Sequence, residues 1–172
     1  MRNLWAPWRM DYILNKKKKG CIFCQKLRED RDGENLILYR GRCAFIMMNL
    51  FPYNSGHLMV IPKRHTIDLE HLTPPEFKEL FFLLRASILT LKTSLFPQGF
   101  NIGINIGEVG GAGEDHIHFH VVPRWKGDTN FMPILGETKV MPEYLENTYQ
   151  KLHSAFRNHL IKSKSDKGGP KK

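Results

Sequence analysis

The sequence predicts an α+β domain built around an antiparallel β-sheet. Short apolar runs of strand-like composition come first, one long amphipathic segment follows, and two further strand-like runs come after it. Because the early runs are joined by short turns, they favour hairpins, and hairpins make antiparallel pairs. A chain of 172 residues can bury a sizeable core in one domain. We therefore expect about five strands, one long helix and a C-terminal helix.

The first three predicted strands precede the long helix. The stretch NLILYRGRCAFIMMNL contains two apolar runs split by Arg40, Gly41 and Arg42, and this pattern predicts a hairpin. Within it, Cys43 is typical of a core residue. The stretch GHLMVIPKRH predicts a third strand that ends at Pro62.

The stretch TPPEFKELFFLLRASILTLKTSLF is the clearest predicted helix. Thr73 can cap its N-terminus, a proline fits its first turn, and Glu76 completes a capping box. Pro97 and Gly99 end it. Apolar residues recur at helical spacing and predict one buried face, made of Phe77, Leu80, Phe81, Leu84, Ile88, Leu91 and Leu95.

Two more strands and a final helix are predicted in the second half. The stretch GFNIGINIG alternates isoleucines with Asn101, Gly103 and Asn105, so the two sets face opposite sides of a strand. The loop EVGGAGED leads into the next strand, HIHFHVVPRW. A helix then begins near Pro142, with apolar residues along one side at Leu145, Tyr149, Leu152, Phe156 and Leu160.

The basic charge is concentrated in two segments. The formal net charge is +9, and residues 16–19 together with residues 161–172 carry eight of these charges. Neither segment interleaves aromatic residues with its lysines, so nucleic-acid binding is not expected. We divide the chain into an N-terminal segment with a lysine run (1–20), a domain (21–160) and a disordered basic tail (161–172).

Nothing in the sequence indicates a membrane or secretion. No apolar run reaches the length of about 18 residues that a transmembrane helix needs. The stretch MRNLWAPWRM lacks the apolar region of a secretory signal. The three cysteines are an odd number, which argues against a disulfide framework. We therefore expect a cytoplasmic protein without membrane contact.

Cys21 and Cys24 form the motif CIFC. In a chain without disulfides, such a pair is either half of a metal site or a redox couple. The redox interpretation is the weaker one, because no thioredoxin-like βαβ pattern surrounds the motif. A metal site would need two further ligands from elsewhere in the chain.

Three histidines, His116, His118 and His120, alternate along the predicted strand HIHFH. Alternate residues share one face of a strand, and neighbours in this row then lie about 6.6 Å apart. Zinc–nitrogen bonds of about 2.0–2.1 Å let two of them reach one ion, but not all three. At least one therefore has another role, as a solvated imidazole or as a nucleophile beside hydrogen-bond donors. The preceding GGAG can offer N–H groups to a phosphate, or form only a tight turn.

These motifs resemble the histidine triad (HIT) family. HIHFHVV fits the family pattern His-φ-His-φ-His-φ-φ, where φ is apolar, and GHLMVIPKRH fits its upstream strand. Asn49, Gly56 and His57 follow CIFC in the order typical of the family. The flanks LWAPWRM and PRWKGDTNFMPILGETKVMPE are similar to a bacterial branch that includes diadenosine tetraphosphate phosphorylases. The resemblance implies the HIT-like fold over most of the chain.

The resemblance also implies a nucleotidyl hydrolase or transferase that acts on dinucleoside polyphosphates such as diadenosine tetraphosphate. His118 would attack the α-phosphorus and carry the nucleotide until water or inorganic phosphate accepts it. His57 and His120 would bracket the α-phosphate and stabilise charge on its oxygens. Two alternatives stay open: a nucleoside phosphoramidase or adenylyl-sulfate-processing enzyme, and a non-catalytic nucleotide- or RNA-binding module.

The implied substrate contacts come from two asparagines and the glycine loop. Asn49 matches the ribose-binding position, although capping a turn is a comparable interpretation. Asn105 matches a polar residue that contacts the phosphate chain or ribose. The N–H groups of Gly111, Ala112 and Gly113 would assist at the α-phosphate.

A metal ion and a dimer are implied as well. Cys21, Cys24, His65 and His116 match the family's zinc ligands, and Cys2His2 is a closed set typical of structural zinc. No organic cofactor is implied. Family members usually pair as homodimers that extend the sheet across a two-fold axis, and we expect the same here.

Overall fold

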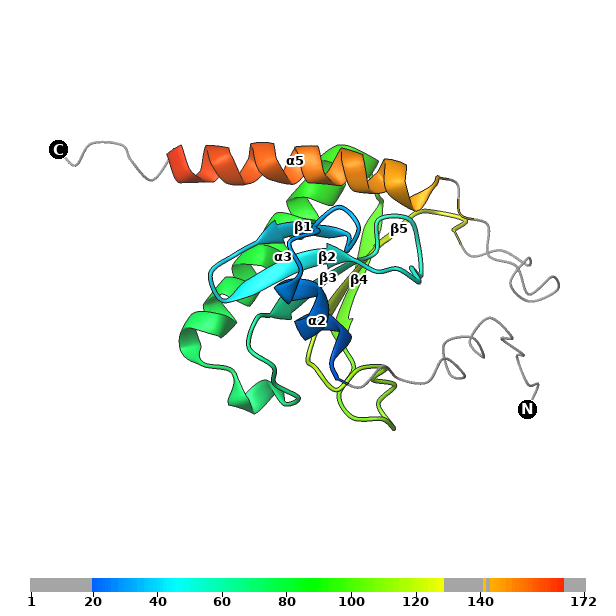
Figure 1. The fold of residues 1–172 in the computed structure, drawn as a ribbon. Helices are drawn as coiled ribbons and strands as arrows, with labels where there is room; N and C mark the ends of the chain where they lie inside the picture. Colours follow the sequence, from blue (N-terminus) through cyan, green and yellow to red (C-terminus); the bar gives the residue numbers. More distant parts are fainter. Residues whose placement is uncertain (1–19, 129–140, 142, 166–172) are drawn as a thin grey trace, which may run out of the picture.

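The fold is described by a computed structural model that covers residues 20–128, 141 and 143–165. Its elements are α2 (Ile22–Arg28), β1 (Ile37–Arg40), β2 (Ala44–Met48), β3 (Leu58–Pro62), the 3-10 turn η1 (Leu69–His71), α3 (Pro74–Leu95), β4 (Gly99–Ile104), β5 (Phe119–Arg124) and α5 (Leu145–Ser165). The five strands of these residues form one antiparallel sheet in the order β1-β2-β3-β5-β4 (Figure 1). The predicted α+β fold is confirmed.

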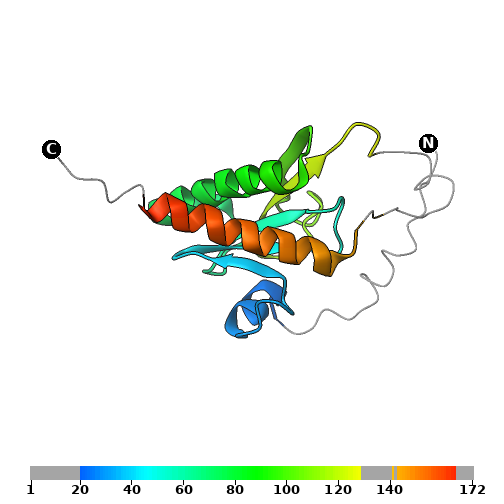
Figure 2. The same ribbon diagram turned by 90° about the horizontal axis from the view of Figure 1, so that it is seen from above.

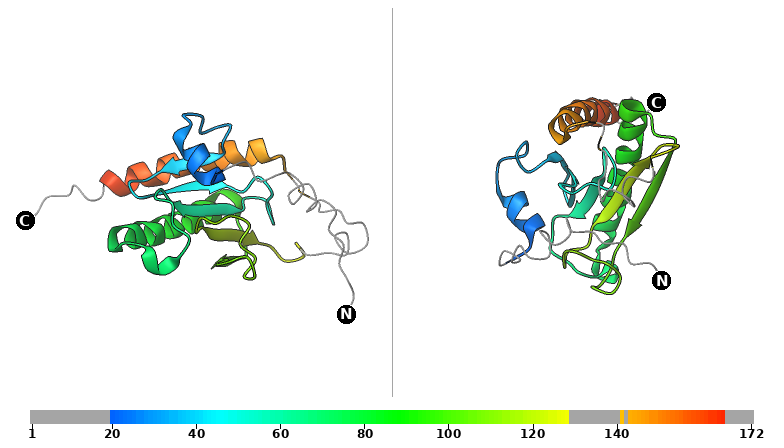
Figure 3. Two further views of the ribbon diagram at one scale, coloured as in Figure 1. Left: turned by 60° about the horizontal axis from the view of Figure 1, so that its bottom comes forward. Right: turned by 90° about the vertical axis from the view of Figure 1, so that its right-hand side faces the viewer.

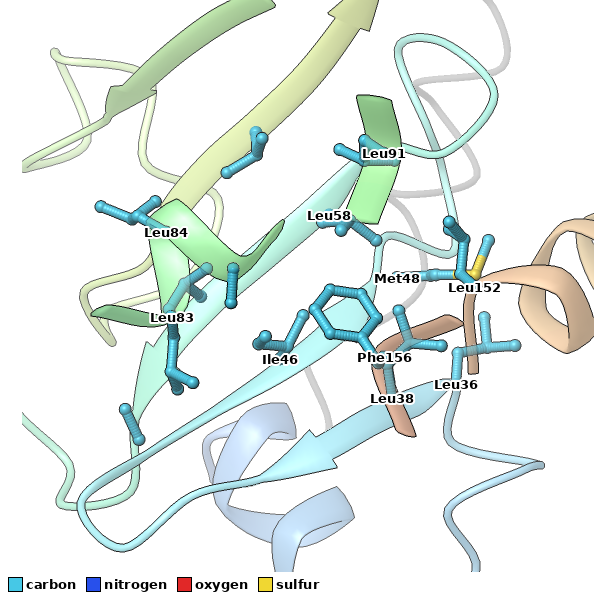
Figure 4. Packing of buried hydrophobic residues seen from close by; sticks show 14 of the residues in the cluster. Leu36, Leu38, Ile46, Met48, Leu58, Leu83, Leu84, Leu91, Leu152 and Phe156 are labelled. Atoms are coloured by element: carbon cyan, nitrogen blue, oxygen red, sulfur yellow. The ribbon is translucent and has the colours of Figure 1, made fainter. Parts of the chain in front are cut away.

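The helices lie on both sides of the sheet. Figure 2 shows α3 and α5 running side by side, and Figure 3 shows the short α2 on the opposite side from α3. A large cluster of buried apolar side chains joins α3 and α5 to the sheet (Figure 4). A smaller cluster, which we call the α2-side cluster, contains Phe23, Ile37, Phe45, Met47, Met59 and Ile61.

Strands β2 and β3 are buried on both faces. In β3, Leu58 and Val60 belong to the cluster under α3 and α5. Met59 and Ile61 belong to the α2-side cluster. Because successive side chains of a strand point to opposite faces, a strand covered on both sides needs an unbroken apolar run. This explains why LMVIP and AFIMM show no polar alternation.

Helix α3 begins at the predicted capping box. The backbone N–H and the hydroxyl of Thr73 each donate to Glu76 Oε2 at 2.8 Å. The predicted buried face is wrong at two positions, because Phe77 and Phe81 are 44% and 51% exposed. Their rings contact each other, and Phe81 contacts Phe119 of β5. Phe119 pairs with Ile104 of the edge strand β4, and within the described residues both rings on α3 stay exposed.

The histidine row is not one continuous strand, which corrects the expectation from its alternation. β5 begins at Phe119, so His120 is the member of the row that lies in it. Ile117 donates its N–H to the carbonyl of Thr66 at 2.8 Å, outside the strand ladder. The segment that carries His116 is therefore anchored beyond β3, on the side of α2.

The C-terminal helix is longer than predicted. α5 continues to Ser165, five residues beyond Leu160, so residues 161–165 are helical although we expected them in the tail. Tyr149, Leu152 and Phe156 are buried, as their spacing predicts.

Some expectations fall outside the described residues. The lysine run at 16–19 and the end of the tail, residues 166–172, belong to this part of the chain. Among the residues that are described, no helix is long and apolar enough to cross a membrane.

Candidate functional site

The three histidines with predicted catalytic roles gather on the α2 side of the sheet. His120 pairs with Met59, a member of the α2-side cluster, whereas its neighbour Val121 belongs to the opposite cluster. The ring centroids of His57 and His120 are 5.1 Å apart. Those of His118 and His120 are 4.7 Å apart.

His118 is held in one tautomer by the backbone. Its Nδ1 lies 2.7 Å from the carbonyl oxygen of His116, and because a carbonyl only accepts, Nδ1 carries the proton. Nε2 therefore keeps its lone pair. Burial lowers the pKa of His118 below its usual value. A neutral imidazole with an unprotonated Nε2 is the form that can act as a nucleophile.

His57 and His120 form a directed hydrogen-bonded chain. The backbone N–H of Tyr53 donates to His57 Nδ1 at 3.1 Å, so the proton of a neutral His57 lies on Nε2. His57 Nε2 then donates to His120 Nδ1 at 2.9 Å, which leaves the proton of a neutral His120 on its own Nε2. Burial, and secondly the nearby His118, lowers the pKa of His120 to about 4 and keeps it neutral.

The neighbouring rings of His118 and His120 consequently present one hydrogen-bond acceptor and one donor. The two rings meet edge to face, with an interplanar angle of 72°. His118 offers a lone pair at Nε2, and His120 offers an N–H at Nε2. A nucleophile beside a fixed donor can attack a phosphorus atom and stabilise the charge on its oxygens.

Asn49 fixes the loop that carries His57. Its Oδ1 accepts the N–H of Phe51 at 2.9 Å, and its Nδ2 lies 3.4 Å from His57 Nδ1. An asparagine that bonds the backbone two residues further on stabilises a turn. The turn-capping interpretation therefore has a contact in the structure, and the ribose contact stays a prediction.

The glycine loop lies against Asn105, whose Nδ2 donates to the carbonyl of Gly111 at 3.3 Å. Two of the three predicted phosphate donors are used inside the turn. Gly111 and Ala112 donate their N–H groups to carbonyls of the same loop, at 3.0 and 3.1 Å. Gly113 follows this turn. Phosphate contacts from Gly111 and Ala112 would require these turn bonds to be replaced.

The four predicted metal ligands lie together. They come from the start of α2, the segment after β3 and the segment before β5: Cys21, Cys24, His65 and His116. Their donor atoms all lie within 4.8 Å of one another. His116 Nδ1 is 3.2 Å from Cys21 Sγ and 3.7 Å from Cys24 Sγ. These residues could hold one metal ion.

The donor set fits zinc in geometry and in protonation. Zn–S bonds of about 2.3 Å and Zn–N bonds of about 2.0–2.1 Å place sulfur and nitrogen about 3.6 Å apart in a tetrahedron. The observed sulfur–nitrogen separations are 3.2, 3.7 and 3.7 Å. His116 Nε2 donates to the carbonyl of Pro62 at 3.0 Å, which leaves Nδ1 for a metal. Burial, and next the nearby His65, lowers the pKa of His116 to about 4, so the ring is neutral as a ligand must be.

Arg40, which the sequence predicted only as part of a hairpin turn, anchors the far end of α2. It donates to the carbonyls of Leu27 and Glu29 at 2.6 and 2.8 Å. It also binds the carboxylate of Asp32 at 2.6 Å. A guanidinium that binds carbonyls at a helix C-terminus satisfies acceptors that have no partner within the helix.

Arg64 anchors the segment that contains His65. Its Nε and Nη2 donate to the carboxylate of Glu76 at 2.9 and 2.8 Å. The bond from Arg64 is the largest cause that lowers the pKa of Glu76 to about 2. Neither Arg40 nor Arg64 belongs to a local motif, because their partners lie in other elements.

Two aromatic residues that contact the histidines were also missed. Tyr53 stacks on His57 with ring centroids 4.8 Å apart, and Phe23 packs on His118 at 5.0 Å. Both lie inside the motifs already identified, since Phe23 is part of CIFC and Tyr53 lies between Asn49 and His57. This position in the sequence is a signal that could have found them.

An antiparallel sheet with a row of histidines beside a Cys2His2 cluster defines a protein of the histidine triad class. The chain belongs to the HIT domain family, whose profile matches residues 31–127. It is 39% identical over 157 residues to a Mycobacterium tuberculosis protein named AP-4-A phosphorylase, a match that covers 86% of this chain and 80% of that protein.

Two further comparisons agree with this family. The asymmetrical bis(5'-nucleosyl)-tetraphosphatase of Schizosaccharomyces pombe is 35% identical over 92 residues, 54% of this chain and 50% of that protein. The crystal structure of a Zn-bound histidine triad family protein from Mycobacterium smegmatis matches with a TM-score of 0.67 and 26% identity. That match covers 83% of this chain and 96% of the other.

Proposed function

We propose that the protein cleaves dinucleoside polyphosphates, such as diadenosine tetraphosphate, through a nucleotide carried covalently on His118. Relatives from M. tuberculosis and S. pombe are named for activities on AP-4-A and on bis(5'-nucleosyl) tetraphosphates. The observation that carries the proposal is the contact between the His118 and His120 rings, with centroids 4.7 Å apart. Their Nδ1 hydrogen bonds leave a lone pair on His118 Nε2 and an N–H on His120 Nε2.

In the first step, the lone pair of His118 Nε2 attacks the α-phosphorus. A P–N bond forms and the P–O bond to the β-phosphate breaks, so diadenosine tetraphosphate would leave AMP on His118 and release ATP. The N–H of His120 donates to a phosphate oxygen as negative charge develops there. In the second step, water or inorganic phosphate attacks the same phosphorus, frees His118 and gives AMP or ADP.

Other residues would position the substrate. His57 keeps the Nδ1 of His120 occupied, which keeps the N–H of His120 on the other nitrogen. We assign contacts with the ribose and the phosphate chain to Asn49, Asn105, Gly111, Ala112 and Gly113. Support comes from the contact of the Asn105 amide with the glycine loop and from that of the Asn49 amide with His57.

We propose that Cys21, Cys24, His65 and His116, which we call the metal cluster, hold one zinc ion. The donor set and its spacing support this ion, and the M. smegmatis neighbour is described as Zn-bound. Four protein ligands fill a tetrahedron, so a bound ion would supply a structural cross-link and no position for water. The cross-link would tie the start of α2 to the segment that carries His116.

We also propose a homodimer that pairs through β4. This strand lies at the sheet edge, and Ile102 on it is 46% exposed. An open strand edge, together with the exposed side chains of Phe77 and Phe81, favours association with a second copy. Light scattering is expected to show a dimer for the wild type and a monomer for Ile102→Glu.

The cytoplasm is the location we propose. A metal cluster uses Cys21 and Cys24 as thiolates, so both must stay reduced. Cytosolic thiols are kept reduced, whereas secreted ones tend to form disulfides.

Turnover of diadenosine tetraphosphate, with and without inorganic phosphate, tests the proposed function. ATP with ADP identifies phosphate as the acceptor, and ATP with AMP identifies water. An adenosine phosphoramidate assayed in parallel ranks the alternative substrate class. His118→Ala is expected to lower turnover at least about a thousandfold, because the nucleophile is lost. The exposed His71 provides the control, His71→Ala, which should keep wild-type turnover; full activity of His118→Ala would contradict the covalent mechanism.

A further inference from the structure

Phe23 lies between the metal cluster and the proposed nucleophile. It stands between Cys21 and Cys24 in CIFC, and its side chain is 4% exposed. Its ring centroid is 5.0 Å from that of His118, with an interplanar angle of 58°. The same ring is 5.7 Å from the ring of His116. One side chain therefore contacts both a metal ligand and the nucleophile.

The imidazole of His118 needs more than its hydrogen bond to stay in place. The bond from Nδ1 to the carbonyl of His116 fixes one nitrogen, but a carbonyl accepts over a broad range of directions. The ring can therefore swing about that bond. His120 contacts the ring edge-on, and Phe23 packs on it from the α2 layer. Both contacts restrict where Nε2 points.

Phe23 is itself held from several sides. It packs in the α2-side cluster with Phe45, Met59 and Ile61. At the far end of α2, Arg40 binds the carbonyl of Leu27. The cysteines on either side of Phe23 belong to the metal cluster. The ring is therefore fixed to the sheet and to the metal-binding segments at once.

We propose that Phe23 is a positioning residue for the nucleophile, which holds the His118 ring so that Nε2 faces the α-phosphorus of the substrate. The proposal rests on the function proposed above. Attack at phosphorus needs aligned reacting atoms, and a displacement of about 1 Å can lower the rate about a hundredfold. A smaller side chain at position 23 would let the ring move without removing a group that touches substrate.

The kinetic test compares two variants of the same helix. Phe23→Leu keeps an apolar side chain and removes the aromatic face. Leu27→Ala is the matched control, because Leu27 packs on the same α2-side cluster from the same helix. In Phe23→Leu we expect kcat to fall about 10- to 100-fold with KM within about twofold of wild type. In Leu27→Ala we expect kcat within about threefold.

A second readout does not depend on turnover. The Nδ1–H of His118 is buried and bonded to a carbonyl, so it should give a slowly exchanging imidazole proton signal in nitrogen-15 histidine-labelled protein. His118→Ala assigns that signal by its disappearance. At the same fixed pH, Phe23→Leu should broaden the signal, because the moving ring samples several hydrogen-bond geometries at Nδ1, and Leu27→Ala should keep it sharp.

Either an unchanged kcat or an unchanged His118 signal in Phe23→Leu overturns the proposal. Equal losses in both variants also overturn it, because they would show that Phe23 acts only through the stability of the helix. If the wild type does not cleave the tetraphosphate, the proposed function fails. The imidazole signal still decides in that case whether Phe23 holds His118.

Discussion

His116 and His118 stand two residues apart, and backbone carbonyls hold them in opposite tautomers. His116 donates from Nε2 to Pro62, which leaves Nδ1 facing Cys21 and Cys24. His118 donates from Nδ1 to the carbonyl of His116 and keeps the lone pair on Nε2. In each case, the carbonyl beside the histidine determines which nitrogen remains for a ligand or a reaction.

The largest expected effect is a loss of turnover that distinguishes the role of His118 from that of His116. His118→Ala is expected to lose turnover at least about a thousandfold while its metal content stays at the wild-type level. The reason is that His118 contributes no donor atom to the metal cluster. Turnover assays and elemental analysis measure the two quantities on the same sample. Loss of metal from His118→Ala would show that the two sites are not separate.

The next largest effect concerns the stability that a metal ion bound beside His116 would add. A chelator is expected to lower the Tm of the wild type but not that of Cys24→Ala, because the variant lacks one of the four proposed ligands and is expected to hold no ion. At a free metal concentration of about a thousand times Kd, the lost stabilisation is about 4 kcal/mol. Cys43→Ala serves as the control, since Cys43 is outside the cluster. Equal responses of wild type and Cys24→Ala would remove the case for a metal.

A smaller effect concerns Asn49 and the loop that carries His57. Asn49→Ala should cost about 1 kcal/mol of unfolding free energy, because the N–H of Phe51 loses its acceptor. If Asn49 also binds ribose, KM should rise about tenfold. Denaturant unfolding and steady-state kinetics measure the two effects. A normal KM together with lower stability would leave Asn49 as a turn cap alone.

The smallest effect concerns pH and the segment next to the metal cluster. Arg64 holds the pKa of Glu76 at about 2, below its ordinary 4.5. A lowered folded-state pKa stabilises the protein above pH 4.5, and this stability is lost as pH falls towards 2. Glu76→Gln should lose at most about 1 kcal/mol near neutral pH and show a flatter decline in acid. Urea unfolding from neutral pH down towards pH 2 measures the free energy of unfolding of the wild type and of Glu76→Gln. An identical decline in acid for the two proteins would refute the role of the Arg64–Glu76 pair.

The parts of the site that were predictable have local signatures. CIFC, the alternating histidines and the capping box of α3 each depend on residues within a few positions of one another. His65 could be added to the metal cluster because it follows an apolar strand in a recognisable family pattern. The structure brings all four proposed ligands together.

The parts that were not predictable depend on distant partners. The start of β5 follows from the bond between Ile117 and Thr66, which no spacing indicates. The anchoring of α2 depends on Arg40, whose partners precede it by 8 to 13 residues in other elements. The tautomers depend on carbonyls that meet the histidines only after folding. Alternation predicted that all three histidines lie on one strand, whereas in the structure β5 begins at Phe119 and only His120 of the row lies in it.

The most direct test of the separate roles of His116 and His118 is to find which residue carries the nucleotide. The protein is mixed with diadenosine tetraphosphate, quenched in alkali to preserve a P–N bond, digested and mapped by mass spectrometry. We predict an adenylyl group on His118, with fragment ions of the same peptide showing His116 and His120 unmodified. An adenylyl group on another residue, or turnover without any adduct on His118, would contradict the assignment of His118 as the nucleophile.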